Sequence, residues 1–329
     1  MRGGRRCAGK PWVIVLTALL CASFASVSHA QQNSNQGRNT GQPGYSQGIS
    51  QGSGHAGGQF IPNNMIVTNA KTQGSSSKQL KEQAIRSIPL QQLSREHQTL
   101  VSDVLNRVAV YRRLPSTTIN TDPDLFLFMV RYPETMLNIW QIMGVTQMEA
   151  TRTAPFNLDF DDGVGTEGRV ELIYGTPNMN IYYGEGIYEG PMLFRRVEGQ
   201  CVLVLQTEYH RDANGNSQTT SHLDVFIRID HLAAGVIART VHPLIGSTAD
   251  HNFVESLLFL QKLSETSESN NNGVMGLSNR LNGIRPEVRQ RFQDVLGIIG
   301  ERTQQPQTRH SSNSMQRYPA QPVYKNRQP

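Results

Sequence analysis

Apolar residues at helical spacing begin the part of the chain that we expect to fold. A first helix is predicted over Lys78–Ser87, ending before Pro89, which has no backbone N–H to donate. A second helix is predicted over about 93–112, with Ser94 as its N-terminal cap. Its apolar positions fall on one helical face and are Leu93, Leu100, Val104, Val108 and Tyr111.

The next segment carries strand and helix signals in turn. Residues 115–121 are β-branched and polar, which predicts an edge strand. Asp122 is suited to cap a helix, and Pro123 is suited to its first position. We therefore expect a helix over 125–143 that breaks at Pro133.

Between residues 146 and 230 the pattern changes to short strands separated by Gly, Pro, Asn and Asp. Asp212–Asn216 is the clearest hairpin turn, and Gly184-Glu-Gly186 is interpreted as a break between two strands. The predicted strands are Met148–Thr153, Phe156–Phe160, Arg169–Tyr174, Met179–Tyr183, Ile187–Tyr188, Leu193–Val197 leading into Cys201–Tyr209, and His222–Asp230. Six or seven consecutive strands with short turns predict an antiparallel sheet.

Helical spacing returns after the strands. A short helix is predicted over Leu232–Val241, ahead of Pro243, and a long one over Asp250–Ser264 with a wide apolar stripe. Ser267–Gly273 is interpreted as a linker, and a last helix is predicted over Pro286–Ile299. The chain therefore belongs to the α+β class, with extra helices at both ends of its sheet.

Both ends of the chain have a different composition from the middle. Residues 31–77 are rich in Gln, Asn, Gly and Ser, and residues 302–329 repeat that bias with added Pro. Such segments bury too little apolar area to offset the chain entropy lost on folding, so disorder is predicted for both. A single domain over 78–301 is expected between them.

The first thirty residues have the pattern of a secretory signal peptide. Four basic residues are followed by an apolar run over 12–27 and by Ser28-His29-Ala30, with small residues at the −3 and −1 positions of a cut after Ala30. An uncleaved membrane anchor is the alternative, but a spanning helix needs about 20 mostly apolar residues. Export to the periplasm or the medium is therefore expected.

Cleavage would leave Cys201 as the one cysteine, so no internal disulfide is expected. Its apolar neighbours predict a buried small side chain rather than a reactive thiol. The signal segment and the two polar tails hold eleven of the 31 basic residues and none of the 26 acidic ones, so residues 78–301 carry a net charge of −6. A mildly acidic core argues against nucleic-acid binding, whereas basic tails could contact an anionic envelope or lipid surface.

The order of elements is edge strand, broken helix, antiparallel sheet and long C-terminal helix. Local sequence in 122–148 adds Asp-Pro-Asp124, Arg131-Tyr-Pro-Glu134, Trp140 and Gly-Val-Thr-Gln-Met148. Over about 116–265 this is similar to the helix-grip fold of the START and polyketide-cyclase-like superfamily. The resemblance implies a sheet wrapped on the last long helix, with an apolar cavity between them. The chain departs from that pattern before 114, after 275 and around Pro243.

Motifs for metal or nucleophilic chemistry are absent from the sequence. No histidine pair has the spacing of a helical zinc site, no Gly-x-Ser-x-Gly occurs, and no glycine loop joins a strand to a helix for phosphate binding. His222-Leu-Asp224 is a lone pair on one strand face, which is too few ligands for a metal. We therefore predict no metal and no cofactor.

Aromatic residues near the predicted cavity are the candidate ligand contacts. Tyrosine combines an apolar ring with one polar group, as ligand cavities require. The candidate ligand-binding residues are Trp140, Tyr174, Tyr182, Tyr183, Tyr188 and Arg195.

Three hypotheses of function follow, in order of preference. The first is an exported binding protein for an apolar ligand, a lipid or a similar molecule, working in the cell envelope. The second is a non-enzymatic structural or interaction protein of the envelope that uses its disordered tails. The third is a cyclase- or hydrolase-type enzyme on the same scaffold, for which His222, Asp224 and Glu185 are the residues to inspect.

Overall fold

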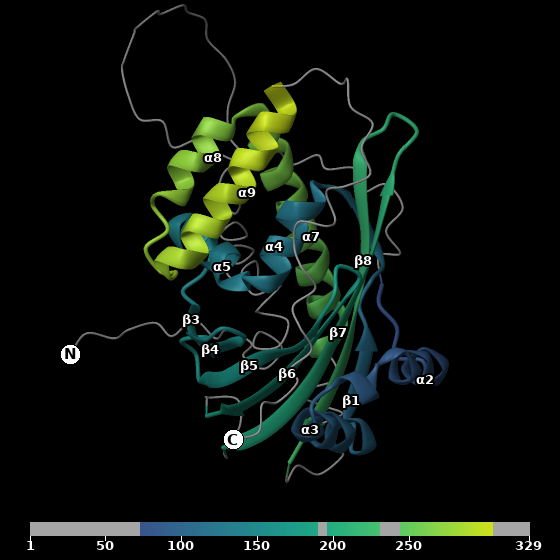
Figure 1. The fold of residues 1–329 in the computed structure, drawn as a ribbon. Helices are drawn as coiled ribbons and strands as arrows, with labels where there is room; N and C mark the ends of the chain where they lie inside the picture. The colour runs from purple at the N-terminus through teal and green to yellow at the C-terminus, as the bar shows by residue number, and fades with distance from the viewer. Residues whose placement is uncertain (1–72, 190–195, 231–243, 305–329) are drawn as a thin grey trace, which may run out of the picture.

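The computed structural model describes residues 73–189, 196–230 and 244–304 (Figure 1). The predicted signal peptide, the predicted helix Leu232–Val241 and most of both predicted tails lie outside the described residues. The described helices and strands run from Lys78 to Gln304.

Eight strands form one antiparallel sheet in the order β1-β8-β7-β6-β5-β4-β3, and β2 pairs with β8 beyond β1. The strands are β1 (Val110–Arg113), β2 (Thr117–Asn120), β3 (Glu149–Ala154), β4 (Asn157–Asp161), β5 (Thr166–Gly175), β6 (Met179–Tyr188), β7 (Val197–Arg211) and β8 (Ser217–Ile229). Consecutive strands from β3 to β8 are neighbours in the sheet because short turns join them. The predicted α+β class and antiparallel sheet are confirmed.

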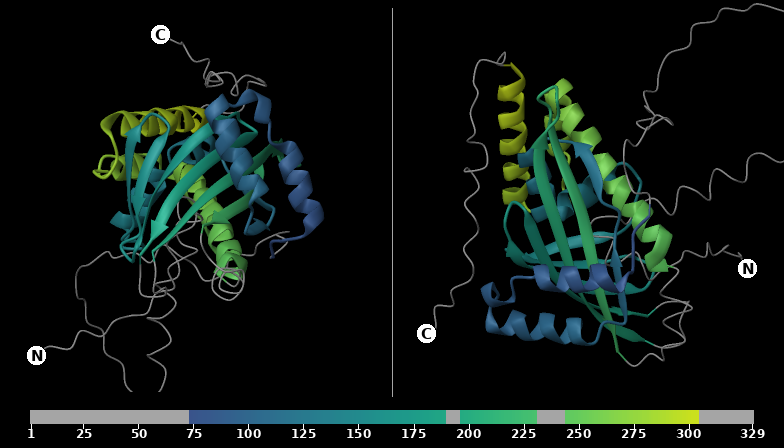
Figure 2. Two further views of the ribbon diagram at one scale, coloured as in Figure 1. Left: turned by 90° about the horizontal axis from the view of Figure 1, so that it is seen from below. Right: turned by 90° about the vertical axis from the view of Figure 1, so that its right-hand side faces the viewer.

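Helices cover both faces of this sheet (Figures 1 and 2). The helices are α2 (Lys78–Ser87), η1 (Leu90–Gln92), α3 (Arg95–Asn106), α4 (Pro123–Arg131), α5 (Pro133–Ile142), η3 (Leu244–Thr248), α7 (Ala249–Ser269), α8 (Asn271–Ser278) and α9 (Pro286–Gln304). We call the face toward α4, α5 and α7 the inner face and the face toward α2 and α3 the outer face. The long helix α7 lies within the curve of the sheet, while α8 and α9 pack behind α4 and α7.

Each face has its own apolar core because successive side chains of a strand point to opposite sides. On β8, Leu223 and Val225 join the inner core with Phe253 and Leu257 of α7. Phe226 of the same strand joins the outer core, in which Val101 and Val104 of α3 are buried. Where α2 and α3 cover it, the sheet is thus buried on both sides, which explains the almost continuous apolar run at Cys201–Leu205 of β7.

Local signals place the broken helix correctly. The Asp122 carboxylate accepts hydrogen bonds from the backbone N–H groups of Asp124 and Leu125. Pro123 occupies the first turn of α4. Tyr132 leaves the helical conformation with φ −127° and ψ 61°, and Pro133 starts α5. The predicted break at Pro133 is therefore present.

Three predicted boundaries are wrong. The helix expected over 93–112 ends at Asn106, and Val110–Arg113 instead form β1, because pairing with β8 overrides the helical spacing. Gly184-Glu-Gly186 does not interrupt a strand, since β6 pairs with β5 and β7 throughout it. The linker expected over Ser267–Gly273 is the end of α7 and the start of α8.

Candidate ligand pocket

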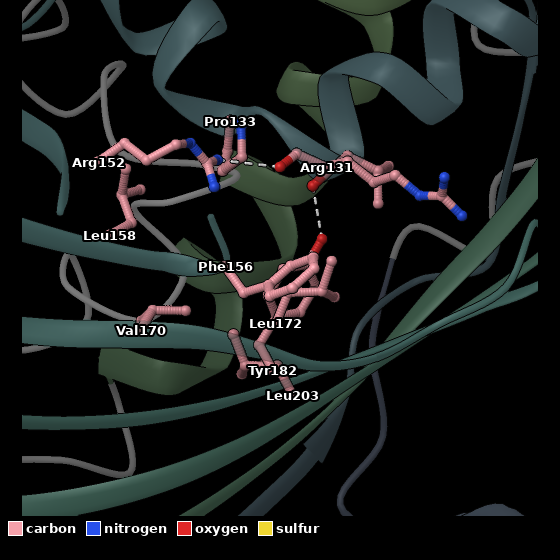
Figure 3. Close-up of a pocket in the computed structure, with 10 residues that line it drawn as sticks. Arg131, Pro133, Arg152, Phe156, Leu158, Val170, Leu172, Tyr182 and Leu203 are labelled. Atoms are coloured by element: carbon pink, nitrogen blue, oxygen red, sulfur yellow. Dashed lines mark hydrogen bonds between the residues drawn. The ribbon is translucent and has the colours of Figure 1, made fainter. Parts of the chain in front are cut away.

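The α4–α5 break frees backbone carbonyl groups, and side chains from the sheet bind them (Figure 3). The Tyr182 hydroxyl on β6 donates to the carbonyl oxygen of Val130 at 2.5 Å. Nη2 of Arg152 on β3 donates to the carbonyl oxygen of Arg131 at 3.1 Å. Burial raises the pKa of Tyr182 well above its ordinary value, so its hydroxyl stays protonated and keeps this donor role.

Arg152 is held in place by a buried ion pair with Glu134. Its Nε lies 2.5 Å from Oε1 and its Nη2 lies 2.8 Å from Oε2 of that carboxylate, in a bidentate arrangement. Nη1 also donates to the carbonyl oxygen of Pro155 at 2.7 Å. The two side chains are 8% and 1% exposed, so the charge of each is compensated almost entirely by the other.

Two guanidinium groups lie close to the Tyr132 ring. Cζ of Arg152 is 4.9 Å and Cζ of Arg291 is 5.8 Å from the ring centroid, both within range of a cation–π contact. Nη1 of Arg291 also donates to the Tyr132 hydroxyl at 2.9 Å. The Tyr-Pro-Glu sequence singled out above thus fixes the helix break against β3 and α9.

A pocket opens beside this junction, between the end of α4 and the inner face of the sheet (Figure 3). Its lining is apolar except where Arg152, Arg131 and the Tyr182 hydroxyl reach it. The apolar lining residues are Val130, Pro133, Phe156, Leu158, Val170, Leu172 and Leu203. The empty space measures about 410 Å³ when the part open to solvent is included, and the fully enclosed part has room for about one water molecule.

Large side chains fill the described interior beyond the pocket. Trp140 is fully buried, and its ring centroid lies 5.4 Å from that of Phe259 on α7. Phe126, Phe128 and Phe253 are buried in the same core. The pocket is therefore a recess at the edge of a packed core.

The structure brings one of the predicted tyrosines to the pocket. Tyr182 lines it, whereas Tyr174 and Tyr183 belong to the outer core on the other face of the sheet. Tyr188 is buried at the end of β6 and does not line the pocket. Ligand binding by these residues stays a prediction.

The two remaining predicted contacts are placed differently. Trp140 packs in the inner core away from the pocket lining. Arg195 lies outside the described residues. Sequence reasoning missed Arg152 and Glu134, although the Tyr-Pro-Glu motif was the available signal for Glu134.

The residues considered for catalysis lie away from this pocket. Asp224 is on the outer side of β8, where its carboxylate accepts bonds from Arg113 at 2.8 and 2.9 Å and from the Tyr111 hydroxyl at 2.7 Å. Nε2 of His222 is 3.7 Å from Oδ2 of Asp224, and burial lowers the pKa of that imidazole. Glu185 is exposed on β6.

Cys201 is buried on β7, and burial raises the pKa of its thiol, which makes it a core side chain as expected. Within residues 73–189, 196–230 and 244–304, no group of three or more His, Cys, Asp and Glu side chains is arranged to hold a metal ion. Among the helices of those same ranges, none has the length and apolar character needed to cross a membrane.

Comparisons with known proteins give likenesses of fold only. No protein-family model and no curated protein matches the chain. An uncharacterized protein from Rhizobium leguminosarum is 15% identical with a TM-score of 0.28, over 45% of this chain and 94% of that one. Ara h 8.0201 is 12% identical with a TM-score of 0.23, over 44% of this chain and 97% of that one.

The di-domain ARO/CYC BexL from the BE-7585A biosynthetic pathway is 11% identical with a TM-score of 0.23. The match covers 59% of this chain and 52% of BexL. TM-scores of this size carry no argument about function. The helix-grip arrangement is instead visible in the chain itself, as strand, paired short helices, antiparallel strands and a long helix against the inner face.

Proposed function

We propose that this chain is an exported protein that binds a small apolar molecule in the pocket at the α4–α5 break. The observation that carries the proposal is the lining: apolar side chains from α4, β4, β5 and β7 surround a recess that Arg131, Arg152 and the Tyr182 hydroxyl also reach. Apolar walls with a few convergent polar groups are the usual composition of a small-molecule site.

Native mass spectrometry of the purified full chain tests the binding part of this proposal. The protein is measured as isolated, after organic extraction, and after incubation with an extract of apolar metabolites. A stoichiometric added mass that extraction removes and incubation restores is the expected result. A chain that stays at its own mass in all three samples would contradict ligand binding.

Export rests on the basic start, the apolar run and the small residues before the cut at Ala30. Intact-mass analysis of protein recovered outside the cytoplasm tests it. We expect a chain that begins at Gln31, and we expect Ala30→Lys to retain the leader, because a large charged side chain does not fit the −1 position. Recovery of wild-type chain with residues 1–30 attached, inside the cytoplasm, would contradict export.

The two other hypotheses receive no support from the described residues. The tails on which an interaction protein would depend lie largely outside them. His222, Asp224 and Glu185 do not line the pocket, so an enzyme that uses them would need a substrate site elsewhere.

A further inference from the structure

We infer that residues 74–77 act as a strap that fastens the start of α7 to the edge strand β1, and that releasing the strap loosens these two segments ahead of the rest of the fold. The strap lies at the sheet edge formed by β1, which does not line the pocket, so this inference does not depend on the proposed function. Three features support it: the course of the strap, the hydrogen bonds of Asp250 and the space around Gly74.

The strap passes from one face of the sheet to the other around its edge. β1 pairs with β8 on one side, and on its other side Ser75 and Arg113 exchange two backbone hydrogen bonds of 2.8 Å. The preceding residue, Gly74, contacts Asp250 in the first turn of α7 on the inner face. Ser77 caps α2 on the outer face. The strap thus joins a helix of each face through the edge strand.

The Asp250 carboxylate is the point at which strap, strand and helix meet. Its side chain is 4% exposed, and its Oδ2 accepts a hydrogen bond from the backbone N–H of Gly74 at 2.7 Å. Nε of Arg112, on β1, donates to Oδ1 at 2.7 Å, and Nη2 of the same side chain donates to Oδ2. A buried carboxylate requires such partners, and a negative charge in the first turn also suits the positive end of a helix dipole. The strap therefore supplies one of the donors that hold Asp250 in place.

The space around Gly74 admits no side chain. A Cβ atom there would lie 2.4 Å from the carbonyl oxygen of Arg113 and 2.5 Å from Oδ1 of Asp250. The first of these atoms belongs to the backbone of a paired strand, so it cannot move away unless the bridge between Ser75 and Arg113 breaks. Glycine is thus required here by the close approach of two chain segments. Such a fit indicates that the strap is a built part of the fold.

Release of the strap should have a local effect because other contacts hold the rest of α7. Phe253, Leu257 and Leu260 anchor the later turns of this helix in the inner core. The first turn contributes the small side chain of Ala249 to that core, and Thr248 before it makes no capping hydrogen bond through its side chain. Segments with few buried apolar contacts open at a lower free energy than the core. The start of α7 therefore depends on its polar contacts with the strap and β1.

Hydrogen exchange of the full chain, measured by mass spectrometry, tests this inference. Ser75→Pro removes the backbone N–H that donates to Arg113. Ser76→Pro is the matched control, because Ser76 is exposed and its N–H donates to no group within the part of the chain that the structure describes. We expect Ser75→Pro to speed exchange at least about tenfold at the end of β1 and in the first turn of α7, and less than about twofold in β5, β6 and α9. Ser76→Pro should leave all these segments within about twofold of the wild type.

Gly74→Ala provides an independent check, because the added Cβ atom must displace Arg113 or Asp250. Its matched control is Gly297→Ala in α9, where a Cβ atom meets nothing within 4 Å. We expect Gly74→Ala to reproduce the local pattern of Ser75→Pro, and Gly297→Ala to exchange no faster than the wild type, since alanine favours a helix over glycine. Uniformly faster exchange of every segment in the strap variants, or equal exchange in Ser75→Pro and Ser76→Pro, would overturn the inference.

The wild type itself gives a measurement that needs no substitution. At rising urea concentrations below the unfolding transition, the amides of the strap, the end of β1 and the first turn of α7 should begin to exchange together, with one urea dependence, before those of β5 and β6. If the first turn of α7 opened with a urea dependence different from that of the strap, the strap would not hold it. That result would overturn the inference even where a variant fails to fold.

Discussion

Helices bury the inner face of the sheet and the part of the outer face under α2 and α3, but the two faces use polar groups differently. On the inner face, Arg152, Glu134 and the Tyr182 hydroxyl gather at the α4–α5 break and border a pocket. On the outer face, Asp224 joins Arg113 and Tyr111, so its hydrogen bonds connect β8 to β1. The inner group of polar side chains borders the pocket, whereas the outer group links β1 to β8 by hydrogen bonds.

This difference follows from what covers each face. The outer face is covered by α2 and α3, which pack flat on the strands through Ala84, Val101 and Val104. The inner face is covered by a helix that breaks at Pro133, and a broken helix cannot pack evenly along a sheet. A recess remains beside the break, and the freed carbonyl groups require donors from the strands. The pocket is thus a consequence of the Tyr-Pro-Glu sequence.

The largest difference in stability between variants of the two faces is expected at the buried Arg152–Glu134 ion pair beside the pocket. Arg152→Leu leaves the Glu134 carboxylate buried without a cation and should lower the free energy of unfolding by about 3–5 kcal/mol. Urea denaturation of the full chain measures it. The double variant Glu134→Leu with Arg152→Leu should recover much of the loss, because no unpaired charge remains buried.

Arg169 and Asp159 form a matched exposed pair, with side chains 52% and 38% exposed. Arg169→Leu should lower the free energy of unfolding by less than about 1 kcal/mol, since solvent screens such pairs. If Arg152→Leu cost no more than Arg169→Leu, the ion pair at the break would be dispensable and the contrast between the faces would lose its main support.

A smaller effect should separate two adjacent tyrosines of β6. Tyr182→Phe removes the hydroxyl that donates to the buried Val130 carbonyl, so it should cost about 1–3 kcal/mol. Tyr183→Phe, on the outer face, should change stability by less than about 0.5 kcal/mol. Thermal and urea unfolding of both variants measure the difference. An equal loss of stability in both variants would show that the Val130 carbonyl group finds a hydrogen-bond donor without Tyr182.

The sequence predicted the order of elements better than the site. Caps and prolines act locally, so the roles of Asp122 and Pro133 could be assigned from their neighbours in the chain. Strand pairing is not local: Val110–Arg113 form a strand because β8, more than a hundred residues later, pairs with them. The same applies to Glu134 and Arg152, whose contact depends on how β3 packs against α5.

The choice among the tyrosines depends on the fold as well. Alternation along β6 separates Tyr182 from Tyr183, but it does not say which of them meets the pocket when both faces are apolar. If one face of β6 were exposed to solvent, polar residues on that face would have shown from the sequence which tyrosine points inward. Here the outer helices α2 and α3 remove that signal.

The smallest expected effect concerns two outer-face histidines with opposite shifts. The hydrogen bond with Glu171, whose carboxylate lies 3.4 Å from Nε2 of His97, raises the pKa of His97 above its ordinary value. Burial lowers the pKa of His222. The stabilisation from His97 is fully present below about pH 6.5 and is lost as pH rises through its folded pKa. That from His222 is fully present above about pH 6.5 and is lost as pH falls through its folded pKa.

NMR titration of the imidazole protons should therefore show His97 titrating at higher pH than His222. In unfolding experiments, His97→Gln should cost more near pH 5.5 than near pH 8, and His222→Gln should cost more near pH 8 than near pH 5.5. Neither variant should alter ligand binding as native mass spectrometry measures it, because neither residue lines the pocket. A titration order opposite to this one would mean that α3 does not hold His97 against Glu171, and that the outer face is less firmly covered than the inner one.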